Sequence, residues 1–264
     1  MINGDDTHTK QIIEEHKEAA VSFGFEGQNA FVGHDAGIQY ENKRPVGMHF
    51  YCHHSNAQIE VSLFGALGKP RVYAALAALA VAEAAGVPLE QAADALRTWA
   101  PPPARMRIIH GLRDSIIIDD TYNSSPAAAA SALETLDEIK GFKKKIAVLG
   151  DMLELGRFSK DAHIEIGKIA AQVVDQLVTV GIRARTIGQT ALDNGLAESA
   201  IRQYGQGESE RAGKELENNL DAQTVVLVKG SQSMRMEKTV EEIMADPARA
   251  QELLVRQDVD WKER

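Results

Sequence analysis

The sequence predicts an α/β protein whose carboxyl-terminal part forms an open, mostly parallel sheet. After residue 104, short apolar runs alternate with helical segments, which is the pattern of parallel strands joined by crossover helices. The run Pro101-Pro102-Pro103 cannot continue a helix, so it marks a linker between Trp99 and Ala104. The pattern before this linker is different, and two domains are therefore expected.

The region before the linker combines strands with two helices. Residues 20–64 have the pattern of short strands and turns, whereas the Ala-rich segment 72–85 and the segment 89–99 have helical patterns. Gly86 is a typical stop after the first helix, and Pro88 is a typical opening of the second. This region is expected to be a small α/β unit.

The region after the linker should contain strands that each precede a helix. The expected strands are 115–118, 145–149, 176–180 and 224–228, and the expected helices are 126–139, 160–174, 208–220 and 234–244. Residues 183–205 fit neither pattern clearly.

Composition excludes several classes of protein. The formal charge of −9 argues against a general nucleic-acid binder, and the one compact basic run, Lys143 to Lys145, is interpreted as the solvated edge of a strand. No apolar run is long enough to cross a bilayer, and Cys52 is the only cysteine, so no internal disulfide can form. With a polar segment from Met1 to Lys10, these features favour a cytoplasmic protein without nucleic-acid or membrane partners.

Two short motifs carry little weight. Gly68-Lys69-Pro70 has proline where a phosphate loop needs Ser or Thr, so it is rejected as such a loop. His53 and His54 are adjacent rather than spaced for a metal, and a solvated strand is favoured there. The sequence predicts no metal ligand.

Polar loops follow three of the four expected strands, at residues 119–126, 150–156 and 229–234. In an open parallel sheet, ligands bind beyond the carboxyl ends of the strands. Asp120 and Lys229 both end apolar strands and both precede capped helices. We therefore expect them to meet at one edge of the sheet, although they lie far apart in the sequence.

The first loop suits a nucleotide. Ser125 is a good N-cap and Pro126 a good first helical residue, so a helix N-terminus should face the same space as Asp120 and Asn123. A carboxylate can accept hydrogen bonds from ribose hydroxyls, while Tyr122 and Asn123 can donate to oxygens of a phosphate or a substrate. Alternatively, the carboxylates of this loop merely cap the helix.

The other two loops also leave alternatives open. Lys229 follows a strand that should be buried on both faces and is well placed for an anion, although it could be a surface lysine. Ser231 is a candidate helix cap. Asp151 and Glu154 could position basic partners or simply cap and solvate a turn.

Three motifs in order resemble the Mur ligase family, in particular the ligases that add D-alanyl-D-alanine. They are Ile118-Asp119-Asp120-Thr121-Tyr122-Asn123, then Val148 to Gly156 with His163 and Gly167, then Val228 to Met234 with Glu237. Sister ligases usually have histidine where this chain has Asn123.

The resemblance implies a fold and a domain plan. It implies a Rossmann-like carboxyl-terminal domain at 105–246, a partial α/β central ATPase domain at 1–100 and a tail at 247–264. The family's phosphate loop, magnesium carboxylate and modified lysine would precede Met1, so the chain is expected to be a fragment or one half of a split enzyme that works with a separate amino-terminal polypeptide. Most of the ATP and Mg²⁺ sites would then lie upstream.

The chain also departs from the family pattern. Pro70, Arg71 and Ala74 replace residues that the family uses near adenine, and Ala104 replaces the glycine before Arg105. These differences favour, as an alternative, a non-catalytic module that keeps the fold and binds a small anion or a partner chain. A sister ligase that adds a single amino acid is the alternative within the family.

By resemblance, ATP phosphorylates the terminal carboxylate of UDP-N-acetylmuramoyl-tripeptide, and the amine of D-alanyl-D-alanine then attacks it. The implied catalytic residues are Tyr122, Asn123 and Lys229, the implied cofactor-binding residues are Arg105 and Asp120, and the implied substrate-binding residues are Asn123, Asp151, Glu154 and Ser231. The chain by itself is expected to be inactive.

Overall fold

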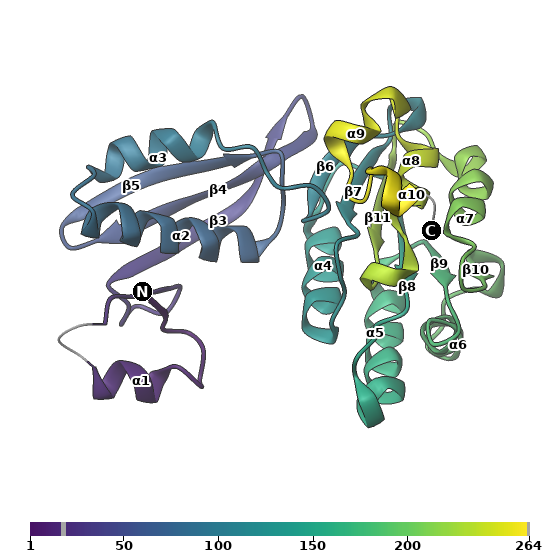
Figure 1. Cartoon of the computed structure of the whole chain (residues 1–264), viewed down its shortest axis with the longest axis horizontal. Helices are drawn as coiled ribbons and strands as arrows, with labels where there is room; N and C mark the ends of the chain where they lie inside the picture. Colours follow the sequence, from purple (N-terminus) through teal and green to yellow (C-terminus); the bar gives the residue numbers. More distant parts are fainter. Residues whose placement is uncertain (17–19, 263–264) are drawn as a thin grey trace. The chain divides into compact units, whose positions relative to one another are not determined.

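The structure is a computed structural model that describes residues 1–16 and 20–262. The chain forms two compact units, Met1–Pro101 and Pro102–Arg264, so the division falls within the proline run (Figure 1). The predicted α/β fold with an open, mostly parallel, Rossmann-like sheet is confirmed in the second unit.

The first unit is built on a sheet of order β1-β2-β3-β4-β5. Its strands are Ile2–Asn3, Ser22–Gly24, Phe31–Glu41, Arg44–His54 and Ala57–Phe64, and a short helix α1 spans Lys10–Glu15. The first three strands are parallel, and β3, β4 and β5 are antiparallel.

The prediction of short strands over residues 20–64 was wrong for β3 and β4, which have 11 residues each. A tight turn at Asn42 and Lys43, both with positive φ, joins them into a long hairpin. Alternate residues of β5 are buried, namely Ile59, Val61 and Leu63. This alternation is typical of a sheet with one covered face.

Helices α2 (Lys69–Ala84) and α3 (Leu89–Arg97) pack on the strands of the first unit. Helix α2 begins three residues earlier than predicted, because Pro70 is tolerated in a first helical turn and Gly68 supplies the preceding positive φ of 95°. Gly68-Lys69-Pro70 is thus a helix start.

The second unit holds a sheet of order β10-β9-β8-β11-β7-β6. Its strands in chain order are β6 Arg107–His110, β7 Ile116–Asp120, β8 Lys144–Gly150, β9 Gln176–Val180, β10 Ile201–Tyr204 and β11 Thr224–Lys229. Only the β6–β7 pair is antiparallel among the described strands of this sheet. The four predicted strands are confirmed, but β6 and β10 were missed because each has four residues at an edge of the sheet.

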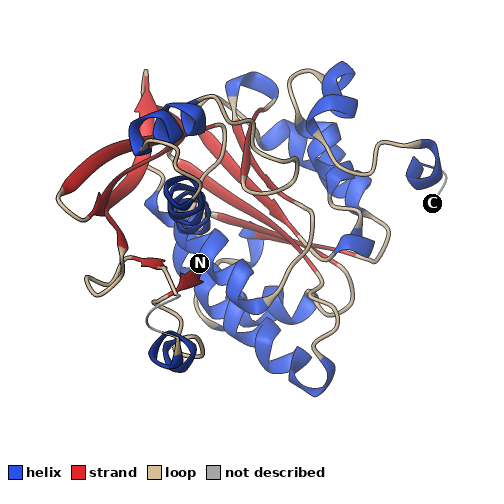
Figure 2. Ribbon diagram, turned by 60° about the vertical axis from the view of Figure 1, so that its left-hand side comes forward, coloured by secondary structure: helices blue, strands red, loops and turns tan. Residues whose placement is uncertain are grey.

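Helices cover both faces of this sheet, as Figure 2 shows in blue around the red strands. Helices α4 (Pro126–Glu138), α5 (Ser159–Val173) and α6 (Arg185–Asp193) pack in a row on one face, and α7 (Ser209–Leu216) and α8 (Glu237–Ile243) pack together on the other. Two short helices, α9 (Ala250–Leu253) and α10 (Val259–Lys262), end the chain. Residues 183–205, whose sequence fitted neither the strand nor the helix pattern clearly, contain α6 and β10.

Two predicted helices are shorter than expected. The segment 208–220 stops being α-helical at Leu216, where a 3₁₀ turn follows. The segment 234–244 begins only at Glu237, because Arg235 has a left-handed backbone with φ of 54°. That interruption brings Arg235 and Glu237 side by side near the strand ends.

The interpretation of Lys143 to Lys145 as a strand edge was wrong. Strand β8 pairs with β9 and β11, so it is an interior strand. The ammonium groups of Lys144 and Lys145 donate to the carbonyls of Asn219 and Asp137 at the amino end of β8. Across the part of the chain that the structure describes, no helix combines the length and apolar character needed to cross a membrane.

Candidate active site at the carboxyl edge of the parallel sheet

Two glycines allow the central loops of the second unit to approach each other. Gly150 ends β8 and Gly230 follows β11, and a Cβ on Gly150 would lie 3.2 Å from the Cα of Gly230. Such contacts are too close for most side chains. The loops after β8 and β11 therefore meet at the carboxyl edge, where ligands bind in sheets of this kind.

The predicted meeting of Asp120 and Lys229 is confirmed. The Lys229 ammonium donates to Asp120 Oδ2 at 2.6 Å and to the carbonyl of Asn123 at 2.9 Å. The side chain of Lys229 is only 2% exposed and that of Asp120 12%, and the other oxygen of Asp120 accepts from the backbone N–H of Met106. The lysine is thus a buried cation that joins β11 to the loop after β7, and it is not a surface lysine.

Asp119 is buried beside this ion pair. Its Oδ1 accepts hydrogen bonds from the N–H and hydroxyl of Thr121, while Oδ2 has no partner among the described residues. Burial, and to a smaller extent the charges of Asp120 and Glu237, raise the pKa of the Asp119 carboxyl to about 7, although the Thr121 hydrogen bonds act in the opposite direction. Asp119 therefore stabilises its own loop, and its ionisation is costly.

Helix α4 points its N-terminus at the same region. Ser125 is its N-cap, as predicted, and accepts from the N–H of Ala128 at 3.3 Å. Asn123 lies just before, where its side-chain oxygen accepts from the N–H of Ser124 at 2.8 Å. A helix N-terminus and an exposed amide together suit a negatively charged or carbonyl group.

The loop after β8 is held by buried side chains. Ser231 Oγ accepts from the N–H of Leu153 at 2.9 Å, and the N–H of Ser231 donates to the carbonyl of Asp151. The buried ring of His163 accepts at Nε2 from the N–H of Met152, 3.1 Å away. His163 is thus a support for the loop.

Asp151 is turned toward the neighbouring helix. Its Oδ1 accepts from the N–H of Ala184 at 2.7 Å, just before α6, and its Oδ2 lies 3.9 Å from Arg183. Of the alternatives left open by the sequence, this geometry favours a cap with a basic partner. Asp151 does not line the pocket described next.

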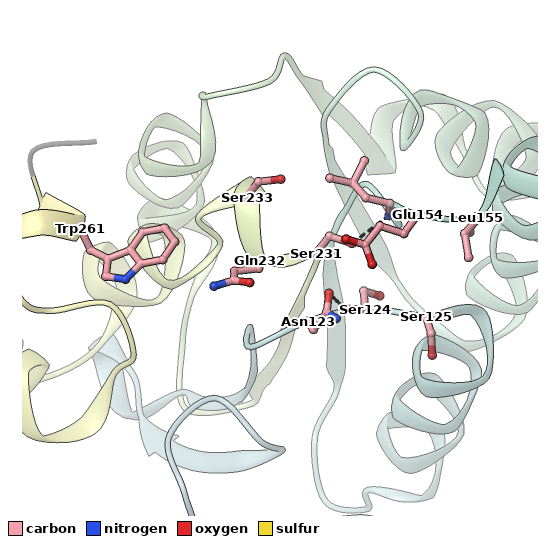
Figure 3. Close-up of a pocket in the computed structure, with 10 residues that line it drawn as sticks. Asn123, Ser124, Ser125, Glu154, Leu155, Ser231, Gln232, Ser233 and Trp261 are labelled. Carbon is pink, nitrogen blue, oxygen red and sulfur yellow. Dashed lines mark hydrogen bonds between the residues drawn. The ribbon is translucent and has the colours of Figure 1, made fainter.

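A pocket of about 600 Å³ opens between these loops (Figure 3). It is lined by Asn123, Ser124, Ser125, Leu153, Glu154, Leu155, Ser231, Gln232, Ser233 and Trp261. Glu154 is the one charged side chain in this lining, and it is exposed with a left-handed φ of 63°. Three predicted substrate-binding residues, Asn123, Glu154 and Ser231, thus share one pocket.

Tyr122 and Arg105 form a separate contact beside the pocket. The Arg105 guanidinium lies 3.9 Å from the centre of the Tyr122 ring, in cation–π geometry. The Tyr122 carbonyl accepts from Arg256 at 2.6 Å. Neither Tyr122 nor Arg105 belongs to the described pocket lining.

The comparisons with known proteins agree on one family. Residues 104–232 match the family model described as the glutamate ligase domain of Mur ligases. The UDP-N-acetylmuramoyl-tripeptide–D-alanyl-D-alanine ligase of Bacillus subtilis is 30% identical over 182 residues, which cover 69% of this chain and 39% of that protein. The ligase of the same name from Mycobacterium bovis is 33% identical over 219 residues, covering 75% of this chain and 42% of that protein.

A solved structure gives the same result. The MurF ligase of Thermotoga maritima, crystallised in complex with ADP, aligns with a TM-score of 0.75 and 25% identity over 91% of this chain and 51% of that one. The chain belongs to the Mur ligase family.

The family match covers the first two polar loops and residues 229–232 of the third, but not the whole pocket. The chain spans about two fifths of the length of the curated relatives it matches. Arg256 and Trp261 lie beyond the matched residues of this Mur ligase chain, and sequence reasoning missed both. A tail of mixed polarity after Asp246 gave no signal for them, since their positions depend on where the chain folds back.

Proposed function

We propose that this chain supplies the carboxyl-terminal half of an ATP-dependent amide ligase that adds D-alanyl-D-alanine to UDP-N-acetylmuramoyl-tripeptide. The proposal includes an amino-terminal portion, on the same or a separate polypeptide, that contributes the phosphate loop. A uridine nucleotide substrate and ATP both imply action in the cytoplasm.

The observation that carries the proposal is the joining of β7 and β11 by Lys229. One buried cation at the end of β11 binds Asp120 and the carbonyl of Asn123, and Asn123 lines a polar pocket. An amide ligase must hold an amine against an activated carboxylate and stabilise the charge that develops between them. Asn123, Ser125 at the N-terminus of α4 and Ser231 line this pocket, which supports their proposed role.

The residues present fit part of an ATP molecule. The side chain of Asp120 is 12% exposed, and each carboxylate oxygen can accept more than one hydrogen bond, so ribose hydroxyls remain acceptable partners. Arg105 is half-buried and carries the charge for a phosphate. When bound, ATP supplies the phosphoryl group that activates the carboxylate.

The residues that the structure describes offer no cluster of ligands that fits Mg²⁺. The described residues contain no group of three His, Cys, Asp or Glu side chains that could hold a metal ion. We therefore assign no Mg²⁺ ligand here, and we expect the 264-residue chain to show no ligation by itself.

The proposal is tested with a chimera. The amino-terminal portion of the Bacillus subtilis ligase that this chain does not match is joined to this chain, and formation of UDP-N-acetylmuramoyl-pentapeptide is followed with ATP and D-alanyl-D-alanine. We expect ligation, and Asp120→Asn should lower kcat/KM by about 10- to 150-fold, as expected for loss of a charge-assisted contact.

A matched control is Asp193→Asn on the exposed end of α6, which should leave kcat/KM unchanged. A folded chimera that fails to ligate overturns the proposed function and favours a non-catalytic module. Preference for a single amino acid over the dipeptide would indicate a sister ligase instead.

A further inference from the structure

Residues 255–262 fold back onto the candidate active site. Residues 255–262, here called the tail segment, include α10 and follow Leu254, which is buried in the core of the second unit. Figure 3 shows Trp261 of this segment at one side of the pocket, next to Gln232 and across from Glu154. The family match ends at residue 232, so the tail segment lies outside the matched residues.

Arg256 fastens the tail segment to the loop after β7. One of its terminal nitrogens donates to the Thr121 carbonyl at 3.2 Å and to Glu237 at 2.9 Å, and the other donates to the Tyr122 carbonyl at 2.6 Å. The Arg256 side chain is 5% exposed and Glu237 is 1% exposed. A buried, forked cation that bonds two successive carbonyls fixes the backbone just before Asn123.

Trp261 is held by the same cluster. The centre of its ring lies 5.3 Å from the guanidinium of Arg235 and 5.7 Å from that of Arg256. The backbone N–H of Trp261 donates to the side chain of Asp258. The indole is half-buried and is the largest side chain in the pocket lining. It offers a flat apolar wall in a lining that is otherwise rich in hydroxyl and amide groups.

We propose that the tail segment is a positioning and specificity element of this site: Arg256 sets the position of Asn123, and Trp261 is the wall against which a bound dipeptide packs. D-alanyl-D-alanine has two methyl groups that suit an indole face and an ammonium group that suits Glu154. The choice of dipeptide rests on the proposed function.

The chain offers a direct test, because it contains two tryptophans, Trp99 and Trp261. In a Trp99→Phe variant, Trp261 is the only indole, and Trp99 belongs to the first unit. Titration of this variant with D-alanyl-D-alanine should change its fluorescence saturably. Trp261→Ala should weaken dipeptide binding, measured by calorimetry, by about two- to tenfold.

Arg256 needs a readout beyond stability. Lysine keeps the charge but cannot bond two carbonyls at once, so Arg256→Lys should raise the dissociation constant of the dipeptide. Arg249→Lys is the matched control, since Arg249 makes a forked pair with Glu252 in the exposed part of the same region. It should leave dipeptide binding unchanged, as should Val259→Ala, whose side chain is 70% exposed.

Several results would overturn the inference. They are absence of dipeptide binding to the parent chain, binding without a change in Trp261 fluorescence, or equal affinities in the Arg256→Lys and Arg249→Lys variants. Binding is measured on this chain and ligation on the chimera, so a chimera that does not ligate beside a tail segment that responds to dipeptide would separate the two proposals.

Discussion

Helix α7 and the carboxyl edge of the sheet both carry ion pairs, but in opposite surroundings. On α7, Lys214 pairs with Glu210 four residues earlier, and the two side chains are 55% and 51% exposed. At the sheet edge, Lys229 pairs with Asp120, and the side chains are 2% and 12% exposed. The pairing chemistry is the same, and the dielectric surroundings differ.

The difference indicates which charges serve a purpose other than stability. The ions of an exposed pair lose little hydration when they pair, and the contact adds little to the free energy of unfolding. A buried pair loses the hydration of both ions, and apolar residues of similar size are often at least as stabilising. Buried ions at the ends of β7 and β11 are therefore better explained by a site that needs charge, such as the proposed ligase site, than by folding alone.

The largest effect is expected from Lys229→Met. This change leaves the Asp120 carboxylate buried without its cation, which should lower the free energy of unfolding of the second unit by about 3 to 5 kcal/mol. Chemical denaturation followed by circular dichroism measures the change. Because the ion pair is buried, Lys229→Met should reduce stability in addition to lowering kcat/KM.

The companion variant is the double change Asp120→Asn with Lys229→Met, which removes both charges. It should recover part of the lost stability, because no unpaired ion remains. If the double variant is as unstable as Lys229→Met, or less stable, the buried charge is not the cause.

The next effect concerns Asp119 and depends on pH. Its pKa is raised to about 7 in the folded protein by burial, so the folded state binds this proton more tightly than the unfolded state does. Stability should consequently fall as pH rises from about 4 to about 7, and then level off. Asp119→Asn removes this loss and should stabilise the protein at pH 8.5 by on the order of 1 to 3 kcal/mol.

Thermal unfolding at pH 8.5 and at pH 4 measures the Asp119 effect. The gain in Tm of Asp119→Asn should be present at the higher pH and absent at the lower one. An equal difference at both values would mean that ionisation of Asp119 contributes nothing.

A smaller effect is expected at the start of α4. Ser125→Ala removes the N-cap that accepts from Ala128, which should cost about 0.5 to 2 kcal/mol. The control is Ser131→Ala inside the same helix, where alanine is the better helix former and no loss is expected. Equal losses in the two variants would contradict a capping role.

The smallest effect is expected for Lys214→Ala on α7. Because the pair with Glu210 is exposed, its loss should leave Tm closer to the parent value than Ser125→Ala does, in both low and high salt. A larger fall in Tm than for Ser125→Ala would remove the contrast between α7 and the sheet edge.

Most of the sheet was predictable because its central strands are buried on both faces and are therefore rich in apolar residues. The runs that became β7, β8, β9 and β11 are mostly apolar without alternation, which is typical of strands covered on both faces. Strands β6 and β10 were not predictable, since edge strands of four residues need fewer apolar side chains. The lysines at 144 and 145 led to the wrong prediction of an edge strand, because they lie at the amino end of an interior strand.

The sequence alone determined the parallel sheet, the cap at Ser125 and the meeting of Asp120 with Lys229, because these depend on local periodicity, on capping chemistry and on the handedness of crossovers. Only the tertiary structure decided that Lys229 is buried and that Asp151 is turned toward α6. It also decided that Arg256 binds the loop after β7 and that Trp261 lines the pocket. Those features depend on side-chain packing between segments that are not neighbours in the sequence, from the 33 positions between Asp151 and Ala184 to the 134 between Arg256 and Tyr122. No local pattern encodes such a contact, since desolvation and hydrogen-bond geometry arise only when the chain has folded back on itself.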